Sequence, residues 1–98
     1  MRYFTEDIRY ELSRNRILEA FDIFSTQTLD PDIRDRVILQ RARYHRALIA
    51  DESEQITYTE RSAQESNIIR NLLRIVEDID RRRKRMIIPN NQATKYGA

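Results

Sequence analysis

The sequence contains no cysteine and no tryptophan, and its 98 residues include one glycine, two prolines and one histidine. The lack of cysteine excludes disulfides, thiolate nucleophiles and sulfur-ligated zinc. Because the one glycine is Gly97, the chain has no glycine-rich loop to cradle a phosphate. His45 shares its predicted helical face with neither an orienting acid nor a nucleophile. We therefore expect no enzyme activity, no metal and no cofactor.

Long apolar runs are also missing. No stretch of about 18 apolar residues could span a membrane, and the first residues, MRYFTEDIRYEL, lack the apolar centre of a signal peptide. A cytoplasmic location follows as the expectation. Hydrophobic residues make up 40% of the chain and charged residues 35%, which fits one small globular domain of marginal stability.

The net charge of +2 combines two regions of opposite sign. Residues 1–80 contain all 16 acidic residues and 12 arginines but no lysine, whereas residues 81–98 contain six cations and no acid. Arginine makes two-pronged bonds to carboxylates and tolerates interfaces well, so the first region suits electrostatically matched protein contacts. We divide the chain into a helical adaptor domain, residues 1–80, and a basic helix end with a disordered tail, residues 81–98.

Two short helices are predicted first. Thr5 is a good N-cap, so the first helix is predicted to start after it. One apolar face of this helix repeats every fourth position: Phe4, Ile8 and Leu12. Residues 13–16 are polar and predict a short joint. The second helix carries apolar residues spaced i, i+3, i+4, i+7: Ile17, Ala20, Phe21 and Phe24. Residues 25–29 are expected to form a loop.

A third helix of about 20 residues is predicted to begin at Asp30-Pro31, because aspartate caps helices and proline fits the first helical position. Its inward stripe comprises Ile33, Val37, Tyr44 and Leu48, flanked by Ile38, Ala42 and Ile49. Residues 51–55 interrupt the pattern.

The fourth helix begins at a capping box, Thr57 to Glu60. It carries two adjacent apolar rows: Ile68, Leu72, Ile75 and Ile79, and Ile69, Leu73 and Val76. This band is wider than one neighbouring helix requires, so the helix is either the centre of the bundle or partly buried against a second copy. Residues 86–89 should end it, since Pro89 pushes the preceding residue out of the helical region. No segment alternates with period 2. The predicted fold is an all-α, small four-helix bundle, with two short helices followed by a long antiparallel helical hairpin.

Three segments together carry a family resemblance: residues 12–21 (LSRNRILEAF), residues 39–46 (LQRARYHR) and residues 56–60 (ITYTE). In this order and spacing, over roughly residues 6–80, they resemble the effector-associated domains of bacterial conflict systems, specifically the type numbered eleven. The chain departs from the family at residues 53–55 (SEQ), where members often have a glycine. The resemblance implies a helical adaptor, comparable in role to death-fold domains, that recruits an effector by like-with-like contacts.

We therefore expect a protein–protein adaptor that recruits or assembles an effector in bacterial defence or conflict signalling. Its partner would be a second copy or the equivalent domain of an effector or sensor. Arginines of the third helix that point away from the core should meet acidic residues of other helices. These candidate partner-binding residues are Arg34, Arg36, Arg43, Arg46, Glu19, Asp22, Glu77 and Asp78.

A basic run suggests an alternative function. It comprises Arg81, Arg82, Arg83, Lys84 and Arg85, which could contact nucleic acid, anionic lipid or the acidic body of a neighbouring copy, or remain a solvated helix end. No aromatic residue interleaves with these cations to stack on bases. The alternative is thus a small basic nucleic-acid-associated regulator acting through residues 81–88.

Overall fold

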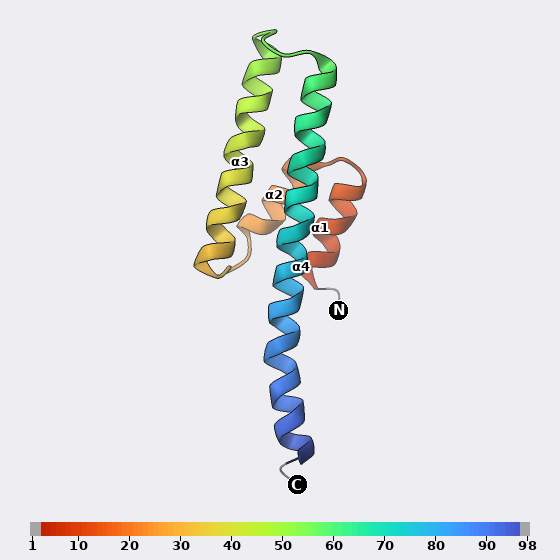
Figure 1. The fold of residues 1–98 in the computed structure, drawn as a ribbon, viewed down its shortest axis with the longest axis vertical. Coiled ribbons are helices and arrows are strands. Elements are labelled where there is room, and N and C mark those ends of the chain that lie inside the picture. Colours follow the sequence, from red (N-terminus) through yellow and green to blue (C-terminus); the bar gives the residue numbers. More distant parts are fainter. Residues whose placement is uncertain (1–2, 97–98) are drawn as a thin grey trace.

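A computed structural model describes the backbone of residues 3–96 and the side chains of residues 3–83. The described chain forms four helices: α1 (Phe4–Ser13), α2 (Ile17–Ser25), α3 (Pro31–Glu52) and α4 (Tyr58–Tyr96). In Figure 1, α3 and α4 run side by side as a long antiparallel hairpin, and α1 and α2 form a short pair beside it. The predicted all-α fold of two short helices and a long hairpin is confirmed.

The first turn of α1 differs from the prediction. Tyr3 is the N-cap and α1 begins at Phe4, so Thr5 lies inside the helix. The Thr5 side chain is buried, and its hydroxyl donates a hydrogen bond of 2.8 Å to a carboxylate oxygen of Asp80. The prediction that Thr5 caps the helix is wrong, because its hydroxyl joins α1 to α4 and does not bind the N–H groups of its own first turn.

The predicted joints between helices are confirmed. Residues 14–16 separate α1 from α2, and Asn15 there has a left-handed backbone with φ of 60°. Asparagine is among the residues that tolerate this conformation best. Helix α3 begins with Pro31 at its first position, as predicted, and Asp30 precedes it. The Asp30 side chain, however, makes no capping hydrogen bond to α3, because its carboxylate faces α4.

The tip of the hairpin joins α3 to α4 through residues 53–57. Glu54 has a φ of 57°, in the left-handed region. The Thr57 hydroxyl accepts a hydrogen bond of 3.1 Å from the backbone N–H of Glu60, as the predicted capping box requires. That bond satisfies one of the N–H groups left without a helical partner at the start of α4.

The hydrophobic core lies among the four helices, with α4 packed against α3 and α1, and α2 packed against α1 and α3. The buried apolar residues of its main cluster are Ile8, Leu12, Ile17, Ala20, Phe21, Phe24, Ile33, Val37, Tyr44, Ile68, Leu72, Ile75, Val76 and Ile79. Both apolar rows of α4 contribute, since Ile69 and Leu73 are also partly buried against this cluster. The wide apolar band of α4 is therefore explained within one chain, which supports the prediction that α4 is the centre of the bundle.

Helix α4 continues past the predicted end at residues 86–89 and ends at Tyr96. Figure 1 shows this part extending beyond the other helices. A proline inside a helix removes one backbone hydrogen bond and usually kinks or ends the helix, yet the helical backbone here continues through Pro89. The helix thus occupies residues 90–96, where a disordered tail was predicted, and residues 97–98 of that tail lie outside the described chain.

Candidate protein-interaction site

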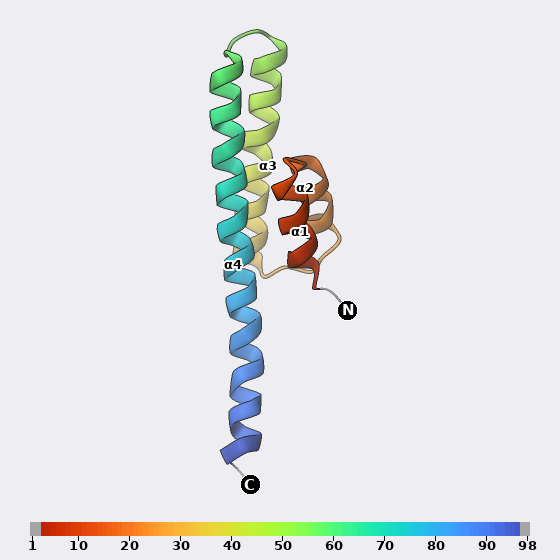
Figure 2. The same ribbon diagram turned by 90° about the vertical axis from the view of Figure 1, so that its right-hand side faces the viewer.

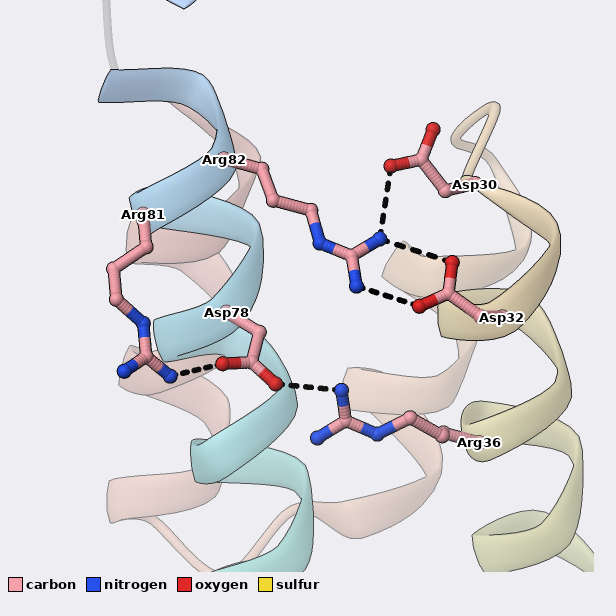
Figure 3. Close-up of polar contacts among 6 residues, drawn as sticks. All are labelled: Asp30, Asp32, Arg36, Asp78, Arg81 and Arg82. Atoms are coloured by element: carbon pink, nitrogen blue, oxygen red, sulfur yellow. Dashed lines mark hydrogen bonds and ion pairs between the residues drawn. The ribbon is translucent and has the colours of Figure 1, made fainter. Parts of the chain in front are cut away.

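Ion pairs hold α4 to the first turn of α3, as Figure 3 shows. The Arg82 guanidinium donates to both carboxylate oxygens of Asp32, at 2.9 and 2.5 Å, and to Asp30 at 3.0 Å. The hydrogen bonds from Arg82 lower the pKa of Asp32 to about 2. The same two carboxylates raise the pKa of Arg82. Both shifts favour the charged forms of Asp32 and Arg82 at neutral pH.

One turn earlier on α4, Asp78 makes a second link to α3. Arg36 donates to Asp78 Oδ2 at 2.6 Å, and Arg81 contacts the other carboxylate oxygen (Figure 3). The hydrogen bond from Arg36, aided by Arg81, holds the pKa of Asp78 below its usual value. Asp78 is therefore an internal partner of α3.

On the other side of α4, Asp80 binds α1. It accepts the hydroxyl of Thr5, and Arg9 lies 2.7 Å from its second oxygen. Burial alone would raise the pKa of Asp80, but the hydrogen bonds from Thr5 and Arg9 outweigh it, so the pKa falls below its usual value. Arg83 lies 3.8 Å from Asp80 and stacks over the ring of Tyr3, 4.0 Å from its centroid.

Three members of the predicted anion-binding run thus face carboxylates of their own chain. Arg81 contacts Asp78, Arg82 contacts α3, and Arg83 contacts Asp80 and the ring of Tyr3, the residue before α1. The side chains of the other two members, Lys84 and Arg85, lie outside the described residues. Contacts that hold the helices together therefore continue past residue 80.

The structure separates the eight predicted partner-binding residues into two groups. Arg36 and Asp78 pair with each other, and Glu19 lies 3.5 Å from Arg16. Arg36 was predicted to meet acids of other helices at an interface, and within this chain it already pairs with one of them, Asp78. A role of Arg36 in partner binding stays a prediction. The other five are exposed, and their side chains make no ion pair or hydrogen bond within residues 3–83: Arg34, Arg43, Arg46, Asp22 and Glu77.

Arg43 and Arg46 line a groove between α3 and α4, which we call the hairpin groove. Its cavity measures about 590 Å³, and its wall includes Leu39, Arg43, Arg46 and Ala50 of α3 and Asn67 and Asn71 of α4. At its floor, the Asn71 amide donates to the buried side chain of Gln40 at 3.3 Å. Two cations and no acid line the groove.

Sequence reasoning missed most of this groove. Leu39, which is 46% exposed, was not singled out, and neither were the amide side chains of α4. The sequence does contain a signal for the groove. Residues seven positions apart lie on nearly the same face of a helix. Arg36 faces Asp78, and one such step along each helix of the antiparallel hairpin places Arg43 beside Asn71. At the position where an acid would neutralise Arg43, the chain has the amide side chain of Asn71.

The structure adds three observations on chemistry. His45 is exposed on α3. Within the described part of the chain, no group of three or more His, Cys, Asp or Glu side chains is placed to hold a metal ion. None of the helices, over the same residues, is long and apolar enough to cross a membrane.

Residues 3–80 match the family model described as effector-associated domain 11. Comparisons with curated proteins and with solved structures found no match. The resemblance noted in the sequence is confirmed, and its one departure has a structural counterpart. At Glu54 the backbone adopts the left-handed conformation that glycine occupies most easily, at the place where the family often has a glycine. The match covers α1, α2, α3 and α4 as far as Asp80, and the chain belongs to the effector-associated domain 11 family.

Proposed function

We propose that this chain is a cytoplasmic, non-enzymatic adaptor of a bacterial conflict system. It recruits or assembles an effector through contacts between its helical domain and a like domain, either a second copy or one carried by the effector or sensor. Membership of the effector-associated domain 11 family supports this role.

The observation that carries the proposal is the contrast along the α3–α4 hairpin. Near the start of α3, Arg36 faces an acid of the same chain, Asp78. Farther along, Arg43 and Arg46 are exposed in the hairpin groove, and the other side chains that line it are amides and apolar residues. Burying such cations costs free energy unless an acid accompanies them, so a partner that covers the groove must bring carboxylates.

The alternative of a nucleic-acid-associated regulator has weaker support. Its candidate residues begin with Arg81, Arg82 and Arg83, whose guanidinium groups contact Asp78, Asp32 and Asp80. A phosphate would have to compete with these carboxylates for each arginine. Competition of this kind would also loosen the attachment of α4 to α3 and α1.

The test is light scattering coupled to size-exclusion chromatography, over a range of concentrations and at low and high salt. The parent chain is compared with a chain lacking residues 84–98, which keeps Arg82 and Arg83. We expect concentration-dependent self-association that survives the deletion. A strictly monomeric parent at high concentration and low salt would overturn the homotypic form of the proposal.

The nucleic-acid alternative is measured in parallel with a fluorescently labelled DNA duplex. Affinity that disappears with residues 84–98 and falls steeply with salt would favour the regulator over the adaptor. We expect no such affinity at physiological salt.

A further inference from the structure

The exposed face of α2 has the opposite charge to the hairpin groove. Helix α2 (ILEAFDIFS) contains two acids and no base. Asp22 is exposed, the Glu19 side chain is 45% exposed, and Leu18 is 44% exposed although it is apolar. We call Leu18, Glu19 and Asp22 the α2 ridge. The hairpin groove, by comparison, presents Arg43 and Arg46 around a wall that includes Leu39 and Ala50.

Two other exposed acids fit the groove less well. Glu77 lines a small pocket with Arg9, Asp80 and Arg81, so two arginines of its own chain already lie near it. Asp35 lies on α3 between Arg34 and Arg36 in the sequence. On the α2 ridge, Arg16 lies 3.5 Å from Glu19, and Asp22 makes no side-chain ion pair within residues 3–83. The α2 ridge is therefore an acidic, partly apolar surface that complements the groove.

The two surfaces lie on opposite sides of the molecule. In Figure 2, α1 and α2 sit together on one side of the hairpin. The crevice between α2 and α3 is lined on α3 by residues that include Arg34, Ile38 and Arg41, whereas the groove uses Arg43, Arg46 and others. At 100° per residue, these two sets point to opposite sides of α3. No residue of α1 or α2 lines the groove.

We propose that the hairpin groove of one copy receives the α2 ridge of the next copy, with Arg43 and Arg46 against Glu19 and Asp22. Leu18 then lies over the small apolar side chains of the groove wall. The inference rests on the proposed homotypic function and adds its geometry. Because the groove and the ridge are different surfaces on opposite faces, every bound copy still presents a free groove or a free ridge. The contact is head-to-tail, so copies add one after another into an open chain, or into a ring where the rotation between copies closes.

Charge disfavours the symmetric arrangements. A two-fold contact of groove on groove would place Arg43 and Arg46 of both copies against one another, and a contact of ridge on ridge would oppose Glu19 and Asp22 in the same way. Like charges facing each other across an interface cost several kcal/mol. Only the unlike pairing of groove with ridge brings acids to the arginines.

The experiment uses charge reversal on each surface of the full chain. The groove variant carries Arg43→Glu and Arg46→Glu, and the ridge variant carries Glu19→Arg and Asp22→Arg. A matched control carries Arg41→Glu and Arg70→Glu, which are exposed arginines outside the groove. The control changes the net charge as much as the groove variant does. Circular dichroism melts check that each variant is folded, and the milder pair Arg43→Gln with Arg46→Gln replaces the groove variant if it is not.

We expect each reversed variant to self-associate roughly tenfold or more weakly than the parent, because each places like charges across the contact. The control should associate like the parent after allowance for its net charge. An equimolar mixture of the groove and ridge variants should associate again and grow beyond a dimer, since each reversed groove then meets a reversed ridge. A chain carrying all four reversals should also regain association.

The outcomes separate this inference from the proposed function. A parent that associates while the groove or the ridge variant associates equally well overturns the head-to-tail geometry and leaves the homotypic adaptor standing. A mixture that stops at a 1:1 dimer also overturns the open chain. A parent that stays monomeric throughout overturns both.

Discussion

Arg82 and Asp32 form a two-pronged ion pair although 50 positions separate them in the sequence. The pair joins α4 to the first turn of α3, and Asp30 adds a third carboxylate bond to the same guanidinium. A planar guanidinium matches two carboxylate oxygens at once, which an ammonium group cannot do. The basic run that begins at Arg81, which suggested nucleic-acid binding, therefore helps to hold α4 against α3.

Replacing this arginine should weaken the fold. We expect Arg82→Ala to lower the melting temperature by a few degrees, since the variant leaves two carboxylates near the start of α3 without their shared cation. Arg82→Lys should recover only part of the loss. Arg70→Ala is the control, because Arg70 is an exposed arginine of α4 with no ion pair within residues 3–83. Thermal melts followed by circular dichroism give the comparison, and equal melting temperatures for the two alanine variants would contradict it.

The paired aspartates predict a loss of stability in acid. Asp32, Asp78 and Asp80 all have pKa values below the ordinary value, that of Asp32 at about 2. The unfolded chain therefore binds more protons than the folded chain between pH about 4 and about 2, and stability falls as pH decreases through that window. Above pH about 5 these groups contribute no further slope. Melting temperatures measured from pH 7 downward check this window. Its upper limit, about 4, is the ordinary pKa of an aspartate, and its lower limit, about 2, is the pKa of Asp32 in the folded chain.

The control for the acid window is Asp32→Asn. The amide cannot titrate, so the variant should start with lower stability at neutral pH and lose less of it on acidification. If the melting temperatures of the variant and the parent fall by the same amount on acidification, the Asp32 carboxylate does not contribute to the loss of stability in acid.

Leu72 lies at the centre of the core, fully buried on α4. We expect Leu72→Ala to reduce the free energy of unfolding by about 2–5 kcal/mol, because it leaves a cavity that the surrounding helices fill only partly. Ile49→Ala is the control, since Ile49 is 62% exposed and should change the free energy by about 0.5 kcal/mol or less. Urea unfolding measures both, and equal midpoints would mean that α4 packs in another register.

Thr5→Val tests the buried hydroxyl between α1 and α4. Valine keeps the shape of threonine but cannot donate to Asp80, so the carboxylate loses one of its hydrogen bonds. We expect a cost of about 1–3 kcal/mol in the free energy of unfolding. The exposed Thr59→Val is the control and should have little effect. Urea unfolding with an unchanged midpoint for Thr5→Val would show that Arg9 and Arg83 hold Asp80 without the hydroxyl.

Periodicity predicted the helices and the core because each depends on residues close together in the chain. The apolar residues of α2, such as Phe21 and Phe24, were placed correctly from their spacing alone. Asp30-Pro31 likewise placed the start of α3, since the backbone preferences of proline act locally. The buried amide of Gln40 was missed, because its hydrogen bond to Asn71 needs the pairing of α3 with α4.

The charged residues were harder to assign, since the same arginine can serve a fold or a partner. A helical wheel gives the direction of Arg36 relative to α3, but it does not give the position of Asp78 on α4. Thr5 is similar: its local sequence favours a cap, and its contact with Asp80 depends on residues 75 positions apart. Of the eight candidate partner residues, five have no side-chain ion pair within residues 3–83, and among these Arg43 and Arg46 line the hairpin groove while Asp22 lies on the α2 ridge.

Glu54 at the tip of the hairpin carries a small conformational penalty. A residue with a side chain pays roughly 1–2 kcal/mol for the left-handed conformation, and glycine does not. The tip lies outside both the hairpin groove and the α2 ridge. Replacing Glu54 with glycine is therefore expected to stabilise the fold without altering either contact surface. The gain would offset part of the loss caused by a destabilising substitution in the core.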